Sequence, residues 1–275
     1  MNYRHAFHAG CVSDVFKHAV LVLLIEQLLQ KDTAVCYLDT HAGLGRYDLT
    51  SEAAEKTGEF RAGIGRLLAG DVPPELARYA ALVRAAQPTS SGLQVYPGSP
   101  ALAQALLRPH DRLVLIELHP DDAAALRHAF RDDPRVHVHH RDGYEALGAF
   151  VPPRERRGLV LIDPPFEERE ELPALVAALV GAHKRWSTGQ YAIWYPIKTR
   201  GALDRFHGAL VESGLRKLLR VEFVPTPDAA LAGSGLVIVN PPWRIEERLS
   251  ALLDQLAPAL GRPDAERRID WLVPE

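Results

Sequence analysis

An Asp, two prolines and a Phe at positions 163–166 directly follow an apolar run at 159–162, and these residue types together could activate an amine. The lone pair of an adenine N6 is delocalised into the ring, so a catalyst must orient the nitrogen before it can attack. A carboxylate and a backbone carbonyl, each accepting one N–H, would do this. The prolines keep the segment extended and add no competing backbone donor. We therefore predict an adenine-amine site, with Asp163 as the catalytic residue and Phe166 stacked on the base.

A second, similar tetrapeptide begins at Asn240, after the apolar run at 236–239. Both tetrapeptides cannot be the amine site. In the methyltransferase variant of a doubly wound sheet the last strand runs antiparallel, which sends its end away from the edge where ligands bind. We therefore interpret the Asn240 tetrapeptide as structural and the Asp163 tetrapeptide as functional.

A glycine-containing turn at 39–45 follows the first predicted strand, and Glu117 ends the second. Glycines allow close approach of the backbone to a ligand, and a carboxylate at the second strand end can accept hydrogen bonds from ribose hydroxyls. Position 48 is Asp48, where the dinucleotide fingerprint has its third glycine, so a nucleoside without a pyrophosphate fits better than NAD. After the third strand, Asp142 could accept a hydrogen bond from the adenine of such a cofactor. An ordinary Asp-Gly turn with Gly143 explains it equally well.

Short aliphatic runs alternate with helical patterns along the chain, which is typical of a mostly parallel sheet covered by helices on both faces. We predict an α/β, Rossmann-like fold with seven strands. About 70 residues separate the first two strands, more than a crossover needs. We therefore predict a helical insertion subdomain at 49–95, with helices at 59–68 and 74–86, inside a domain formed by 1–48 and 96–275. The predicted strands are 35–39, 113–117, 136–140, 159–163, 190–195, 217–224 and 236–240.

Composition is that of a globular enzyme, with 47% hydrophobic and 24% charged residues. The longest apolar stretch, at 19–25, is far shorter than the roughly 20 residues of a membrane-spanning helix. The N-terminus has no secretory pattern, so we expect a cytoplasmic protein. Cys11 and Cys36 form no metal motif, and three histidines at 137–140 alternate between strand faces, so we predict no metal site. The net charge of −3 means that any contact with a nucleic acid must use local basic clusters.

Six segments match a known family: residues 3–10, 38–43, 96–100, 117–120, 161–165 and 271–275. The chain resembles the bacterial 23S ribosomal RNA adenine-N6-methyltransferases of the J type from end to end. The resemblance implies a Rossmann-like core with a helical insertion, S-adenosylmethionine as cofactor and one adenine of 23S ribosomal RNA as substrate. No membrane or metal is implied, and we expect a monomer.

Carried over position by position, the resemblance also implies the roles of individual residues. Without the resemblance, His18 would be interpreted as an ordinary core histidine. Two departures accompany it: the family member compared has Tyr where Phe166 stands, and the loop at 228–232 differs. Phe keeps the stacking face and loses a hydroxyl. The implied cofactor-binding residues are His18, His41, Ser99, Glu117, Asp142 and Gly143, the catalytic residue is Asp163, and the residues placing the target nucleotide are Tyr3, His5 and Lys17.

Other functions remain open on the sequence. A DNA adenine or protein-amide methyltransferase could use the same tetrapeptide. An RNA-binding module without activity is a second alternative, although Asp163, Glu117 and Gly43 argue against it. An NAD-linked oxidoreductase is a more distant third.

Overall fold

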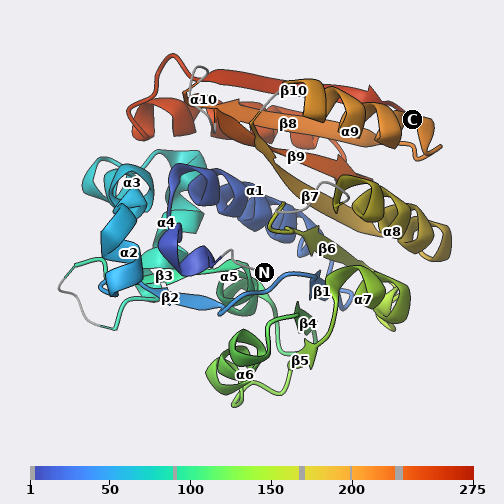
Figure 1. Cartoon of the computed structure of the whole chain (residues 1–275), viewed down its shortest axis with the longest axis horizontal. Helices are drawn as coiled ribbons and strands as arrows, with labels where there is room; N and C mark the ends of the chain where they lie inside the picture. Colours follow the sequence, from blue (N-terminus) through green and yellow to red (C-terminus); the bar gives the residue numbers. More distant parts are fainter. Residues whose placement is uncertain (1–3, 89–91, 167–170, 199, 227–231) are drawn as a thin grey trace.

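A mixed β-sheet runs through the molecule in the order β10-β8-β9-β7-β6-β1-β4-β5 (Figure 1). The computed structural model describes residues 4–88, 92–166, 171–198, 200–226 and 232–275, and the elements below are those of these residues. The sheet strands are β1 (Cys36–Asp39), β4 (Arg112–Glu117), β5 (Val136–His140), β6 (Gly158–Ile162), β7 (Gln190–Ile197), β8 (Leu218–Val224), β9 (Gly233–Val239) and β10 (Glu266–Val273).

The strand directions follow the predicted methyltransferase variant of the doubly wound sheet. β1 lies between β4 and β6 and is parallel to both, and β5 and β7 extend this parallel core on either side. β9 is inserted between β7 and β8 and runs antiparallel to each of them. All seven predicted strands therefore lie in this sheet, and the predicted α/β, Rossmann-like methyltransferase fold is confirmed.

An eighth strand, β10, pairs antiparallel with β8 at the edge of the sheet. This strand was not among those predicted. Its first three residues are charged and exposed, and only its last residue, Val273, is buried. Charged residues interrupt its apolar ones, so it lacks the short aliphatic run by which most of the other strands were predicted.

Helices cover both faces of the sheet because the strand side chains alternate between two hydrophobic clusters. On β4, Leu113 and Leu115 belong to one cluster, whereas Val114 and Ile116 belong to the other. The first face is covered by α1 (Val12–Leu28), α5 (Ser99–Leu106), α6 (Pro120–Ala129) and α10 (Ile245–Ala259), and the second by α7 (Gly143–Phe150), α8 (Glu171–Arg185) and α9 (Arg200–Glu212).

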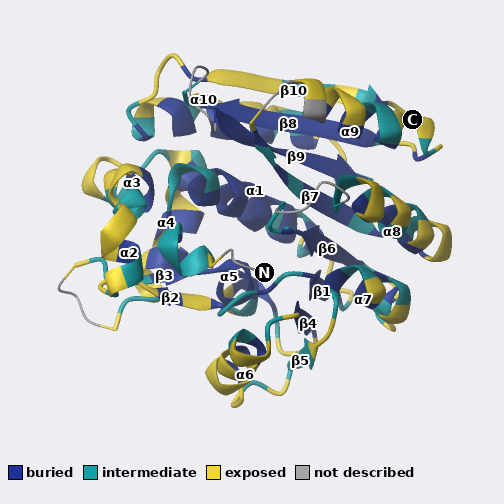
Figure 2. Ribbon diagram, in the orientation of Figure 1, coloured by how far each residue is buried: buried dark blue, intermediate teal, exposed yellow. Residues whose placement is uncertain are grey.

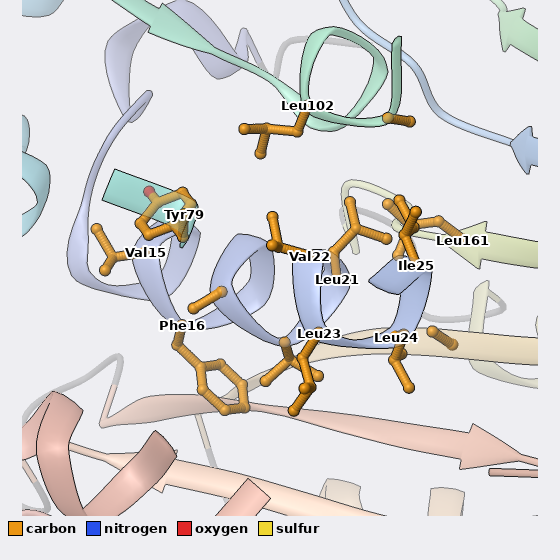
Figure 3. Close-up of a cluster of buried hydrophobic side chains, with 14 of the residues drawn as sticks. Val15, Phe16, Leu21, Val22, Leu23, Leu24, Ile25, Tyr79, Leu102 and Leu161 are labelled. Atoms are coloured by element: carbon orange, nitrogen blue, oxygen red, sulfur yellow. The ribbon is translucent and has the colours of Figure 1, made fainter. Parts of the chain in front are cut away.

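Helix α1 is buried along almost its whole length, in contrast to the surface helices α6 and α8 (Figure 2). Its apolar side chains contact the sheet on one side and α4 (Ala77–Ala85) and α5 on the other (Figure 3). The ring of Phe16 stacks on Phe223 of β8 with centroids 6.0 Å apart. Among the described residues, no helix is both long and apolar enough to cross a bilayer.

The segment between β1 and β4 contains a small antiparallel pair, β2 (Arg46–Asp48) with β3 (Val95–Pro97), and several short helices between them. The predicted helix at 74–86 corresponds to a 3-10 turn, Pro74–Leu76, followed by α4 (Ala77–Ala85). Buried side chains such as Leu76 and Tyr79 join the same hydrophobic cluster as α1. The division of the chain at 49–95 remains a prediction, but the inserted helices share their core with the sheet domain.

The predicted helix at 59–68 contains a π-helical stretch, Arg61–Gly65, which is followed by the short α3 (Arg66–Ala69). Gly63 interrupts it with non-helical angles, and a Cβ there would lie 2.1 Å from the carbonyl oxygen of Gly10. The helical periodicity is therefore broken by a close contact with the N-terminal segment, which no local pattern indicates. Helix α2 (Glu52–Thr57) was not predicted.

Because α1 is the centre of the core, we expect Leu24→Ala to lower the free energy of unfolding by about 2–5 kcal/mol through lost burial and an unfilled cavity. Leu24 is fully buried. Urea denaturation measures the change. Val211→Ala is the control, since Val211 is 46% exposed on α9 and its truncation should change stability by no more than about 0.5 kcal/mol. Equal effects of the two substitutions would contradict the central place of α1.

Candidate active site

A cavity lies at the carboxyl ends of β1, β4 and β6, where parallel strands bring their following loops to one edge of the sheet. Helix α1 supplies polar groups to it from one face of the sheet. The cavity collects residues that are far apart in the sequence. Its lining includes His5, Lys17, His18, His41, Gly43, Tyr47, Ser99, Glu117, Asp122, Asp163 and Pro165.

Lys17 joins two carboxylates inside this cavity. Its Nζ lies 2.6 Å from Oδ2 of Asp163 and 3.0 Å from Oδ1 of Asp14. The Lys17 side chain is 5% exposed and that of Asp163 is 16% exposed. A buried ammonium is stable only when paired, so the two carboxylates fix its position. In turn, Lys17 holds one oxygen of Asp163 and fixes the orientation of that carboxylate.

Asp14 is a functional candidate that the sequence analysis missed. It is buried at the start of α1 and accepts hydrogen bonds from the backbone N–H of Gly10 at 2.9 Å and from His5 Nε2 at 2.9 Å. Burial alone would raise the pKa of Asp14, but the nearby His5 and Lys17 hold it well below its usual range. The available signal was its spacing: Asp14 lies three residues before Lys17 and four before His18, which places all three on one face of the helix.

Aromatic side chains lie beside the Lys17–Asp163 pair. The Lys17 ammonium is 5.5 Å from the ring centroid of Trp194 on β7, and Phe166 contacts the same ring with centroids 5.8 Å apart. Trp194 therefore lies near the site. Tyr195 is instead buried on the other face, where its hydroxyl donates to Glu222. The predicted stacking of Phe166 on a base remains a prediction.

Glu117 stands at the end of β4 with both carboxylate oxygens hydrogen-bonded to backbone. Oε2 accepts from the N–H of Gly43 at 2.8 Å, and Oε1 accepts from the N–H of His119 at 2.8 Å. Gly43 has a φ of +57°, which favours glycine, and a Cβ there would meet the hydroxyl of Tyr47. Burial raises the pKa of Glu117. The turn after β1 is therefore tied to the carboxylate, as expected for a nucleoside-binding edge.

His18 and His41, two of the three histidines that line the cavity, are held in the neutral form by burial. Burial lowers the pKa of His18 to about 3, with a further contribution from Lys17, and burial lowers that of His41 to about 4. A neutral imidazole has one donor and one acceptor nitrogen. These side chains can therefore hydrogen-bond a ligand without adding charge.

Asp39 is a second group that the sequence analysis did not assign. It is fully buried at the end of β1 and accepts from the hydroxyls of Tyr37 and Ser99, each at 2.7 Å. Burial raises the pKa of Asp39 to about 6, although both hydrogen bonds oppose the rise. Its carboxylate holds the Ser99 side chain at the cavity.

Asp142 and Gly143 lie beside the cavity and are absent from its lining. Asp142 Oδ1 accepts from the backbone N–H groups of Tyr144 and Glu145 at 2.9 Å and caps α7. A Cβ on Gly143 would lie 2.5 Å from the carbonyl oxygen of Thr40, so this position requires glycine. Their binding roles remain predictions. Tyr3 and most of the loop at 228–232 lie outside the described residues.

The Asn240 tetrapeptide lies at the opposite edge of the sheet. Because β9 is antiparallel to β7, its end adjoins the start of β7. The Asn240 side-chain amide donates to the carbonyl oxygens of Ser187 and Gly189, both at 2.8 Å, in the turn before β7. Its interpretation as a structural element agrees with these contacts.

Among the described residues there is no group of three or more His, Cys, Asp or Glu side chains that could hold a metal ion.

Comparisons with known proteins agree with this arrangement. The model of a family described as ribosomal RNA large subunit methyltransferase D, RlmJ, matches residues 32–273. Two proteins named ribosomal RNA large subunit methyltransferase J align with this chain over the full length of both partners: that of Haemophilus influenzae is 42% identical and that of Escherichia coli 44% identical. A crystal structure of a protein from Legionella pneumophila, 33% identical, covers 96% of this chain and 98% of its own with a TM-score of 0.89.

The raised pKa of Asp39 predicts a pH dependence of stability. Between about pH 4 and 6 the folded protein binds this proton and the unfolded chain does not. The free energy of unfolding should therefore gain a contribution as the pH falls from 7 to 4, and this contribution is lost as the pH rises through about 6. Urea denaturation across this range measures it.

Asp39→Asn, which cannot titrate, should be less stable overall but should lack this contribution. Asp32→Asn is the control because the Asp32 side chain is fully exposed, and it should keep the wild-type slope. Parallel stability curves for wild type and Asp39→Asn would contradict the assignment.

Proposed function

Since the chain belongs to the RlmJ family of ribosomal RNA large subunit methyltransferases, we propose that it transfers a methyl group from S-adenosylmethionine to the N6 amine of one adenine in 23S ribosomal RNA. The observation that carries this proposal is the placement of Asp163. Its carboxylate is held by Lys17 at the edge of a cavity whose remaining groups suit a nucleoside with an amino-acid tail.

The cavity residues fit S-adenosylmethionine by their chemistry. Glu117, the carboxylate at the end of β4, is suited to accept from ribose hydroxyls. Neutral His18 and His41, with Ser99, offer hydrogen bonds to the polar amino-acid end without adding charge. Gly43, whose backbone is tied to Glu117, lets the chain approach closely. These side chains would hold the cofactor.

Asp163 would orient the adenine amine. Lys17 occupies its Oδ2, which leaves Oδ1 to accept one N6 hydrogen while a carbonyl of the proline segment accepts the other. Both bonds direct the nitrogen lone pair toward the methyl donor. S-adenosylmethionine would supply an electrophilic methyl group to this nitrogen, with S-adenosylhomocysteine as the leaving group. The N6 proton then passes to Asp163 or to water.

The substrate must reach this cavity as an unpaired base. An adenine inside an RNA helix hides its amine, so the target is either single-stranded or flipped out. Lys17, Trp194 and Phe166 lie beside Asp163 and would contact the base. We further propose that His5, which is hydrogen-bonded to Asp14, helps to place the nucleotide. We also propose a cytoplasmic location, since ribosomal RNA is the substrate, and a monomeric enzyme stays a prediction.

We expect Asp163→Asn to reduce the rate of methyl transfer by about 10²–10⁴-fold, because an amide cannot accept the amine proton. The affinity for S-adenosylhomocysteine should change little. The rate is measured with labelled methyl donor and unmodified 23S RNA, and the affinity by calorimetry. Asn240→Ala is the matched control from the second tetrapeptide, and the folded variant should retain wild-type transfer. Full activity of Asp163→Asn would refute the role of this carboxylate.

The substrate class has its own test. Unmodified 23S RNA, duplex DNA and a release-factor protein are offered in parallel with labelled methyl donor, and only the RNA should become labelled at N6 of adenine. Labelling of DNA or of a protein amide would show that the proposed RNA substrate is wrong. Comparing N6-methyladenine in 23S RNA from cells with and without this chain then identifies the nucleotide.

A further inference from the structure

A chain of three buried hydrogen-bonding side chains runs from the inserted helices to the cavity. We propose that Tyr96 is a positioning residue that keeps the ring proton of His18 on Nε2, and that Tyr96 itself accepts a hydrogen bond from Tyr79 of α4. The result is a hydrogen-bond donor presented to an anionic group in the cavity. The inference rests on the proposed function, because that group would be the carboxylate of S-adenosylmethionine.

His18 carries a single ring proton at neutral pH. Its side chain is buried in α1, and burial lowers its pKa to about 3. The neutral ring has two possible forms, with the proton on Nδ1 or on Nε2. Which form is present decides whether the ring offers a donor or a lone pair to the cavity that it lines.

The hydrogen bonds determine the form. His18 Nδ1 lies 2.6 Å from the Tyr96 hydroxyl, which lies 2.9 Å from the Tyr79 hydroxyl. Both tyrosines are fully buried, and within the described part of the chain Tyr96 is the only hydrogen-bond partner recorded for the Tyr79 hydroxyl. If Tyr96 donated to Tyr79, the Tyr79 hydrogen would be buried without an acceptor, which is costly. Only the direction Tyr79 to Tyr96 to Nδ1 satisfies every donor.

The proton of His18 is therefore on Nε2. Nδ1 is occupied by Tyr96, so Nε2 is the nitrogen left for a ligand in the cavity. An Nε2–H donor attracts a carboxylate, whereas a lone pair at the same place would repel it. His18 can thus bind an anion while remaining neutral itself.

This arrangement gives the insertion a role in ligand binding. Tyr79 belongs to α4, which packs against the start of α1 beside Val15 (Figure 3). Tyr96 lies on β3, which returns the chain from the inserted helices to Ser99. The same segment therefore brings one cavity residue and orients another.

The position of the proton is measured directly by long-range ¹H–¹⁵N correlation of the histidine side chains in the full-length protein. The His18 signals are assigned by comparison with His18→Gln. We expect Nε2 protonated, Nδ1 unprotonated, and no titration between about pH 5 and 8. A proton on Nδ1 would overturn the proposal, whatever the protein binds.

Two variants test the chain. Tyr96→Phe removes the donor to Nδ1, so binding of S-adenosylhomocysteine should weaken about tenfold and the His18 nitrogen signals should change. Tyr79→Phe should leave the His18 proton on Nε2, because the Tyr96 hydroxyl still donates to Nδ1. If the hydrogen bonds instead ran from His18 to Tyr96 to Tyr79, loss of the Tyr79 hydroxyl would free Tyr96 to donate to Nδ1, and the His18 proton would move from Nδ1 to Nε2. Tyr191→Phe is the control, since Tyr191 is equally buried and donates to Trp186 O, far from the cavity.

The outcomes separate this inference from the proposed function. If the wild type binds no S-adenosylhomocysteine, the proposed function fails. The position of the His18 proton in the wild-type spectrum then decides the inference by itself. If the wild type and a folded Tyr96→Phe bind equally well, the inference fails while the proposed function stands. If Tyr96→Phe does not fold, the spectra of wild type and Tyr79→Phe still decide.

Discussion

The pairing of one buried ammonium with two carboxylates is the constraint on which the site depends. Lys17 is almost completely buried, and its ammonium pairs with both Asp14 and Asp163. This pairing joins the start of α1 to the loop after β6, so turning the Asp163 carboxylate away would break its ion pair with Lys17. Asp163 is therefore pre-oriented before any substrate enters, and positioning of this kind is what an amine methylation needs.

Helix α1 serves the core and the site at once. Its apolar side chains join the sheet to the inserted helices, while Lys17 and His18 line the cavity and Asp14, one turn earlier, pairs with Lys17. Rigid packing fixes the helix, and the helix in turn fixes the polar groups. Side chains on such a helix are positioned more precisely than side chains on loops.

Most of the sheet was predictable because most of its strands are short buried apolar runs, and all seven predicted segments formed strands, including the alternating Val-His segment of β5. The solvated β10 and the interrupted helix at Gly63 were not, since their structure depends on an edge position and on contact with Gly10. In the site, strand-end residues such as Asp163 and Glu117 were predictable from their positions. Asp14 and Asp39 were missed, because their significance lies in partners distant in sequence.

The sequence by itself determined which residues follow the strands, and hence which edge of the sheet carries the chemistry, because chain direction in a parallel sheet is set by connectivity. It also distinguished Asp163 from Asn240 once the last strand was expected to run antiparallel. Only the tertiary structure decided which charges pair across the cavity, and which nitrogen of His18 faces Tyr96. Those facts follow from burial, which raises the energy of every unpaired charge and donor and so selects one arrangement among those that the chain allows.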